Sequence, residues 1–95
     1  MFHTVKSVDP LPDFNLHIIF NNGDAKIYDV KPMINKHEAF QAFYLTYKLF
    51  EQVKIDGGGY GVSWNEDIDL SCNELFYNGK PVFKEYENTA EKSKH

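Results

Sequence analysis

Acidic side chains between Asp56 and Asp69 are the residues whose spacing comes closest to a chemical site. Glu66, Asp67 and Asp69 follow one another closely, and Asp56 precedes them across a predicted hairpin. Carboxylate oxygens are preferred ligands of Ca²⁺ and Mg²⁺. The spacing lacks the regular ligand series of a D-x-[DN]-x-[DN]-G loop. We therefore expect no metal site here and interpret the acids as a solvated rim.

Nucleophilic and phosphate-binding chemistry has equally little support. Cys72 is the only cysteine, and no histidine stands near it in the chain. Ser63 and Ser71 lack the local motif of an activated serine. The run GGGYG at residues 57–61 suggests a phosphate loop, but such a loop opens a helix, and here a predicted strand follows. We identify no catalytic residue and expect a non-enzymatic protein that needs no cofactor.

Composition narrows the partners that this chain can bind. The 95 residues carry 14 acidic and 10 basic side chains, for a net charge of −4, and every base is lysine. Arginine is the residue best suited to bidentate contacts with phosphate or guanine, so we expect no direct nucleic-acid binding. The sequence shows no signal peptide, and no apolar run approaches the roughly 20 residues that cross a bilayer. We therefore expect a cytoplasmic protein without a membrane partner.

Residues 53–79 predict the elements that would position these side chains. Residues 53–55 alternate apolar and polar, and Tyr60, Val62 and Trp64 alternate with small residues, which is typical of two half-buried strands. The three glycines between them permit a tight turn. We expect an antiparallel hairpin with the rings of Tyr60 and Trp64 on its apolar face.

The helix that follows this hairpin has signals at both ends. Ser71 and Glu74 have the spacing of a capping box. In that arrangement the Ser71 hydroxyl accepts from the Glu74 N–H, and the Glu74 carboxylate accepts from the Ser71 N–H. Gly79 predicts a left-handed residue that ends the helix. We therefore expect a helix over residues 71–78.

An earlier part of the chain predicts a second hairpin. Residues 16–20 alternate apolar and polar and residues 25–30 follow, although the pattern leaves open which face of that second strand is buried. Asn22-Gly23 between them is a favoured two-residue loop. A weaker strand across residues 3–9 comes first, and we expect Pro10 to end it.

Aromatic residues dominate the segment between the two hairpins. Phe40, Phe43, Tyr47 and Phe50 recur at helical spacing, which predicts a helical face packed against the sheet. The sequence leaves open whether residues 38–50 form one helix or two short ones.

Together these elements predict one α+β domain over residues 1–83. We expect a small twisted antiparallel β-sheet built from hairpins, with short α-helices packed on one face. Residues 84–95 contain three lysines, three glutamates and little apolar mass. For these last residues we expect a polar, disordered tail.

Two motifs stand out in the sequence: the hairpin FNNGDAKIYDV, and the W-x-x-x-I-D-L pattern followed by L-F. Both motifs resemble those of a bacterial family known as domain of unknown function 2442. The matching residues are Phe20, Gly23, Tyr28, Asp29, Trp64, Ile68, Asp69, Leu70, Leu75 and Phe76. The resemblance covers about residues 3–79 and departs from the family at residues 39–50, which are longer and richer in aromatics.

The resemblance implies a small α+β domain, which in some members is encoded beside another small protein in an arrangement similar to a toxin–antitoxin pair. Other members are joined to a helix-turn-helix domain. We do not expect such a domain here, so no DNA-binding function carries over. The resemblance also supplies no catalytic residue.

These observations predict a protein-interaction or regulatory module. Its candidate binding residues are Trp64, Asp67, Asp69, Tyr60 and Tyr47. The expected partner is another protein, such as a small protein encoded nearby, or a second copy in a homodimer. The alternative is a small-ligand binder with an aromatic pocket lined by Tyr44, Tyr47, Tyr60 and Trp64. An enzyme of unknown reaction is the third interpretation.

Overall fold

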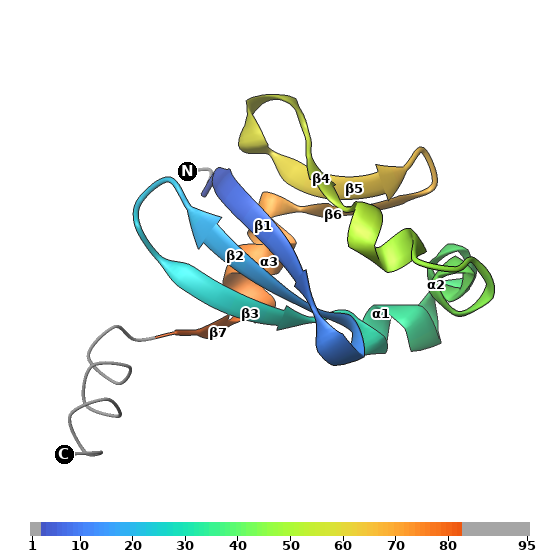
Figure 1. Ribbon diagram of the computed structural model, residues 1–95. Coiled ribbons are helices and arrows are strands. Elements are labelled where there is room, and N and C mark those ends of the chain that lie inside the picture. The colour runs from blue at the N-terminus through green and yellow to red at the C-terminus, as the bar shows by residue number, and fades with distance from the viewer. Residues whose placement is uncertain (1–2, 83–95) are drawn as a thin grey trace, which may run out of the picture.

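Two small antiparallel sheets and several short helices make up the fold, which confirms the predicted α+β class (Figure 1). The computed structural model describes residues 3–82. The first sheet has the order β1-β2-β3-β7 and the second the order β4-β5-β6. Their bounds are β1 Val5–Leu11, β2 Asn15–Phe20, β3 Ala25–Asp29, β7 Lys80–Pro81, β4 Lys54–Ile55, β5 Gly61–Asn65 and β6 Ile68–Ser71. The predicted tail at residues 84–95 lies outside the described residues.

The helical segments are short, and most of them lie in sequence between β3 of the first sheet and β4 of the second. The α-helices are α1 Lys31–Lys36, α2 Ala42–Leu45 and α3 Cys72–Asn78. Single 3₁₀ turns cover Pro12–Phe14 (η1), Glu38–Gln41 (η2), Leu49–Gln52 (η3) and Gly57–Gly59 (η4). Within the described residues, no helix has the length and apolar character needed to cross a membrane.

The core lies between the four-stranded sheet, the three-stranded sheet and α3. Leu16, Ile18 and Phe20 of β2 are fully buried, as their alternation predicts. The Phe20 ring meets that of Phe76 in α3 edge to face, with centroids 5.1 Å apart. In β3 the buried residue is Tyr28, which settles the face that the sequence leaves open.

The aromatic segment at residues 38–50 is several short turns and not one helix. Lys48 adopts a left-handed conformation (φ 59°) between α2 and the following 3₁₀ turn. Phe40, Phe43 and Phe50 are buried as predicted, but Tyr47 is 86% exposed. The prediction that all four rings share one buried face is therefore wrong for Tyr47, because α2 ends at Leu45 and the extended Thr46 (φ −115°, ψ 115°) breaks the helical spacing before Tyr47.

The first sheet also differs from the sequence-based prediction at its turns. Strand β1 continues through Pro10 to Leu11, because the strand lies at the edge of the sheet and needs no N–H from proline on its outer side. The β2–β3 loop is closed by hydrogen bonds from Phe20 N–H to Asp24 C=O (2.8 Å) and from Gly23 N–H to Phe20 C=O (2.9 Å). Of the loop residues only Gly23 has a positive φ. The loop is therefore a three-residue bulged turn and not the predicted two-residue turn.

The predicted β4–β5 hairpin is present, and its glycine turn also joins the two sheets. Gly59 lies against β1 with a φ of +76°, and a Cβ there would lie 2.8 Å from the Val5 carbonyl oxygen. Only glycine permits so close an approach. One part of the prediction is wrong: Tyr60 is exposed, because the 3₁₀ turn at the glycines places it before β5 begins.

Helix α3 begins and ends where predicted, but two details differ. The Ser71 hydroxyl accepts from the Glu74 N–H at 3.1 Å, which confirms the cap. The Glu74 carboxylate does not reach back to Ser71, because it accepts from the Tyr28 hydroxyl at 2.7 Å. Gly79 is extended (φ −75°) and not left-handed. A Cβ at Gly79 would lie 2.5 Å from the Leu75 carbonyl oxygen, so close packing explains this glycine.

Candidate functional site

Trp64, the first candidate binding residue, lies in the core and is 5% exposed. Its indole N–H donates to the Phe50 carbonyl oxygen at 2.9 Å. The centroids of its ring and the rings of Phe43 and Phe50 lie 4.8 and 5.7 Å apart. The buried Trp64 ring therefore packs against Phe43 and Phe50 of the aromatic segment and does not face solvent.

The other four candidate residues are exposed but lie at different parts of the second sheet and of the aromatic segment. Tyr60 follows the glycine turn, and Asp67 lies in the turn after β5, at the opposite end of that strand. The Asp67 N–H donates to the Asn65 side chain at 2.8 Å. Asp69 is an exposed residue of β6, and Tyr47 follows α2.

The acidic side chains do not converge. Asp56 accepts a hydrogen bond from the Ser63 hydroxyl at 2.6 Å. Among residues 3–82, no group of three or more His, Cys, Asp or Glu side chains could hold a metal ion. The four aromatic residues of the predicted ligand pocket likewise line neither of the two grooves described below.

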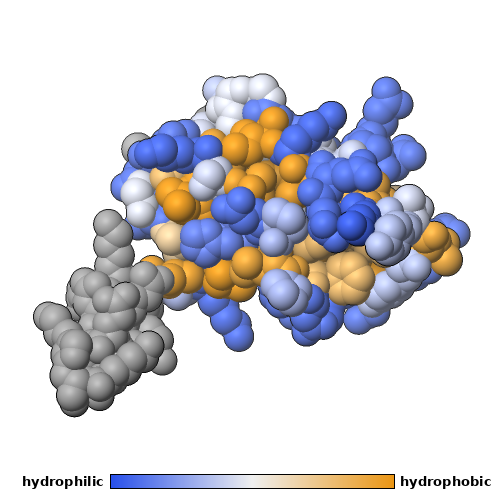
Figure 2. Space-filling view, in the orientation of Figure 1, coloured by the Kyte–Doolittle hydropathy of each residue, from blue (hydrophilic) through white to orange (hydrophobic). Residues whose placement is uncertain are grey.

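An exposed apolar surface instead occupies the end of the molecule formed by α2 and its neighbours. We call it the aromatic corner, and it consists of Phe14, Tyr44, Leu45 and Tyr47. Tyr44, Leu45 and Tyr47 are 58%, 84% and 86% exposed. The Phe14 ring meets that of Tyr44 edge to face at 5.4 Å. In Figure 2 this end of the molecule shows a small hydrophobic spot among residues of intermediate or hydrophilic character.

A groove of about 490 Å³, the corner groove, opens beside the aromatic corner. Phe14, Phe43, Leu49 and Phe50 give it an apolar lining. Asp13, Lys48 and Glu51 add charged groups to that lining. Since Phe14 belongs to both features, the aromatic corner and the corner groove form one surface.

Backbone strain is concentrated at the corner groove. Asp13, Phe14 and Lys48 are the non-glycine residues with positive φ in the described part of the chain, and all three line it. Such conformations cost on the order of 1–3 kcal/mol each and persist only where surrounding contacts impose them. The contacts at Phe14 are its ring packing on Phe43 and Phe50 and a hydrogen bond from the Val30 N–H to its carbonyl oxygen (2.9 Å).

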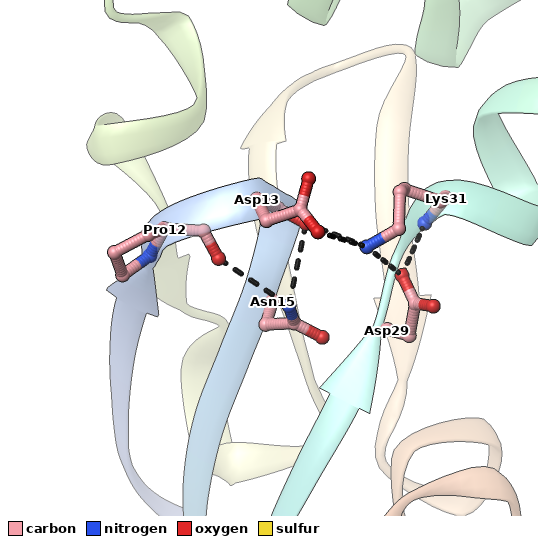
Figure 3. A network of polar contacts seen from close by, with 5 residues as sticks. All are labelled: Pro12, Asp13, Asn15, Asp29 and Lys31. Carbon is pink, nitrogen blue, oxygen red and sulfur yellow. Dashed lines mark hydrogen bonds and ion pairs between the residues drawn. The ribbon is translucent and has the colours of Figure 1, made fainter.

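A polar network secures the residue before Phe14 (Figure 3). Lys31 Nζ lies 2.7 Å from the Asp13 carbonyl oxygen, 3.2 Å from the Asp13 carboxylate and 2.9 Å from the Asp29 carboxylate. The Asn15 side-chain amide donates to the Pro12 and Asp13 carbonyl oxygens, at 3.3 Å each. The network therefore joins the β1–β2 turn to the start of α1.

A second and larger groove, of about 710 Å³, lies between β3, α1, α3 and β7. We call it the charged groove; its ionisable residues are Tyr28, Asp29, Lys36, His37, Glu74 and Lys80. Burial, followed by the hydrogen bond to Glu74 and its charge, raises the pKa of the Tyr28 hydroxyl above its usual range. Desolvation opposes ionisation of Asp29, but hydrogen bonds from Lys31 and the charges of Lys31 and Lys80 lower its pKa overall.

Comparison with known protein families identifies the family of this chain. The profile of a family described as "Protein of unknown function (DUF2442)" matches residues 5–81. The chain belongs to the DUF2442 family. Neither a curated protein nor a solved structure gives a significant match.

Motif residues of this DUF2442 domain have structural partners. Tyr28 binds Glu74, Asp29 binds Lys31, and the Trp64 indole binds the backbone of Phe50. The exposed surface that sequence reasoning missed lies in the aromatic segment. Leu45 lies two residues after the buried Phe43 in α2, so its side chain is on the opposite side of the helix and is exposed.

Proposed function

We propose that this DUF2442 domain is a non-enzymatic protein-interaction module that binds its partner through the aromatic corner. The observation that carries the proposal is the exposure of Tyr44, Leu45 and Tyr47, three large side chains within four residues. Contiguous exposed apolar surface on a small protein often marks an interaction site, and tyrosine is enriched at the energetic centres of interfaces.

The backbone beneath these residues supports the same function. Phe43 and Phe50, on either side of the exposed run, are buried against Trp64. The Thr46 N–H also donates to the Ala42 carbonyl oxygen at 2.8 Å. A surface held in this way loses little conformational freedom when a partner binds, which favours affinity.

The corner groove gives this surface a place for an apolar side chain of the partner. Its lining rings are already packed on one another, with Phe43 and Phe50 meeting edge to face at 5.2 Å. Lys48 lies over the Tyr47 ring at 5.4 Å and extends the surface toward the groove. An apolar anchor with a charged rim is the usual arrangement of a binding surface.

The proposed partner is a small protein encoded nearby, and the proposed location is the cytoplasm. The single cysteine, Cys72, is buried and unpaired, which suits a reducing compartment. A regulatory role, in which binding controls the activity of that partner, is part of the proposal.

Co-expression with the neighbouring gene product tests the proposal. We expect the wild-type domain to copurify with it and the double variant Leu45→Ser/Tyr47→Ser to lose about 2 kcal/mol or more of binding free energy, roughly thirtyfold in Kd. Both side chains are exposed, so the variant should keep its folding stability to within about 0.5 kcal/mol.

The matched control is Tyr77→Ser, which removes an exposed tyrosine from α3. We expect this control to bind like the wild type. Equal binding by the double variant would move the interaction to another surface. A domain that associates only with itself in sedimentation, and loses that association in the double variant, would replace the hetero-partner by a second copy.

A further inference from the structure

In the charged groove the two carboxylates have partners in the described part of the chain, but two lysine side chains do not. The two carboxylates are engaged, since Asp29 pairs with Lys31 at 2.9 Å and Glu74 accepts from Tyr28 at 2.7 Å. Within residues 3–82, no hydrogen bond or ion pair holds the side-chain ammonium group of Lys36 or of Lys80. The groove therefore offers cationic groups whose donors are uncommitted.

Lys80 lies close enough to Asp29 to affect its titration, but Lys31 already occupies that carboxylate. One carboxylate thus faces two ammonium groups at this side of the groove. Lys36, in the last turn of α1, is the second lysine of the lining, and it is followed by His37, whose ring lies against Phe40 with centroids 6.0 Å apart. The lining carries two lysines, Lys36 and Lys80, and two carboxylates, Asp29 and Glu74, so it is locally neutral in a chain whose net charge is −4.

Apolar side chains form the rest of the lining. Ile27 of β3 and Pro32 and Met33 of α1 contribute to it. Met33 also packs against the core, which holds its side chain in place. The volume of about 710 Å³ lies within the range of roughly 300–1,000 Å³ that is usual for small-molecule sites.

We propose that the charged groove binds a small organic anion that has an apolar body. The anionic group, a carboxylate or a phosphate monoester, pairs with Lys36 and Lys80, and the apolar body lies against Ile27 and Met33. Lysine suits either group, because its ammonium acts as a point charge and does not demand a planar fork of acceptors. This site is separate from the aromatic corner and does not depend on the proposed partner.

Titration of the full chain with matched probes, followed by amide chemical shifts in NMR, tests the site. The probes are hexanoate, hexyl phosphate and hexylammonium, with acetate and inorganic phosphate as anions without a body. We expect hexanoate or hexyl phosphate to shift the amides of Ile27, Met33 and His37 with saturation below about 10 mM. Preference between these two probes identifies the anionic group.

Hexylammonium carries the same body with the opposite charge and should not bind. The double variant Lys36→Gln/Lys80→Gln should weaken binding about tenfold or more, which is about 1.4 kcal/mol. The control Lys6→Gln/Lys54→Gln removes the same net charge from β1 and β4, and should change the Kd less than about twofold. Equal binding of hexylammonium, equal loss in both double variants, or no saturation with either anion would overturn the proposal.

Discussion

Tyr28→Phe tests the contact that joins β3 to α3. The substitution removes one hydroxyl, whose hydrogen bond to the Glu74 carboxylate is 2.7 Å long. Hydrogen bonds to charged groups contribute about 1.5–3 kcal/mol, but Glu74 is only half-buried, so water can reach the carboxylate that is left without its donor. We therefore expect the free energy of unfolding to fall by about 1–2 kcal/mol.

Urea unfolding followed by the fluorescence of Trp64 measures this loss. The m-value should stay unchanged, since the surface exposed on unfolding is nearly the same. In a double-mutant cycle with Glu74→Ala, the coupling free energy should be about 1 kcal/mol. Tyr77→Phe is the matched control, because Tyr77 is exposed and its hydroxyl makes only a long contact, of 3.4 Å, with His3 Nε2. A coupling free energy near zero would refute the reasoning.

The raised pKa of the Tyr28 hydroxyl predicts that the protein loses stability at alkaline pH. Burial and the Glu74 carboxylate raise the pKa of Tyr28 in the folded protein above the ordinary 10.0. Above pH 10 the unfolded chain therefore loses this proton while the folded protein keeps it, and stability falls by at most about 1.4 kcal/mol per pH unit. The stability difference between the wild type and Tyr28→Phe should therefore narrow above pH 10. A constant difference up to pH 11 would show that Tyr28 titrates normally.

Substitutions at three further positions test the packing and the helix cap by thermal or urea unfolding. Trp64→Phe should cost about 2–4 kcal/mol, because it leaves a cavity and removes the donor from the buried Phe50 carbonyl; a cost below about 1 kcal/mol would contradict this. Ser71→Ala should cost about 1 kcal/mol through loss of the cap, while Ser71→Asp should retain most of the stability. Gly61→Ala should cost about 1–3 kcal/mol, because the new Cβ would lie 2.5 Å from the Leu70 carbonyl oxygen; an unchanged midpoint would be inconsistent with that close contact.

Sequence patterns predicted the structure correctly in β2 and at the start of α3, where neighbouring residues decide it. Alternation along β2 identified Leu16, Ile18 and Phe20 as core residues. The hydroxyl of Ser71 and the N–H three residues later identified the start of α3. In each case the information lies within one strand or one helical turn.

Patterns failed where a distant residue or an unusual backbone conformation decides the outcome. The Glu74 carboxylate has a partner 46 residues away in sequence, Tyr28, which replaces the local bond of the capping box. Tyr47 is exposed because α2 ends at Leu45 and Thr46 is extended, and no glycine or proline in this part of the sequence signals that end. Two successive left-handed residues at Asp13 and Phe14 are equally without a sequence signal.

The two grooves could not be predicted, because each is assembled from separate parts of the chain. The corner groove joins the β1–β2 turn to residues 43–51, and the charged groove joins β3 and α1 to α3 and β7. Pairing of Asp29 with Lys31 is what leaves Lys80 uncommitted. Such an arrangement depends on tertiary structure and not on residue type.

The strand order of the first sheet has a consequence for how copies of this chain meet. Its outermost strands are β1 and β7, and these contain Pro10 and Pro81. Val82 N–H donates inward to Ala25 C=O, so the nitrogen of Pro81 faces away from the sheet and has no proton to offer an incoming strand. Both edges of this sheet therefore lack a backbone N–H at their proline, which disfavours edge-to-edge pairing of two copies through this sheet.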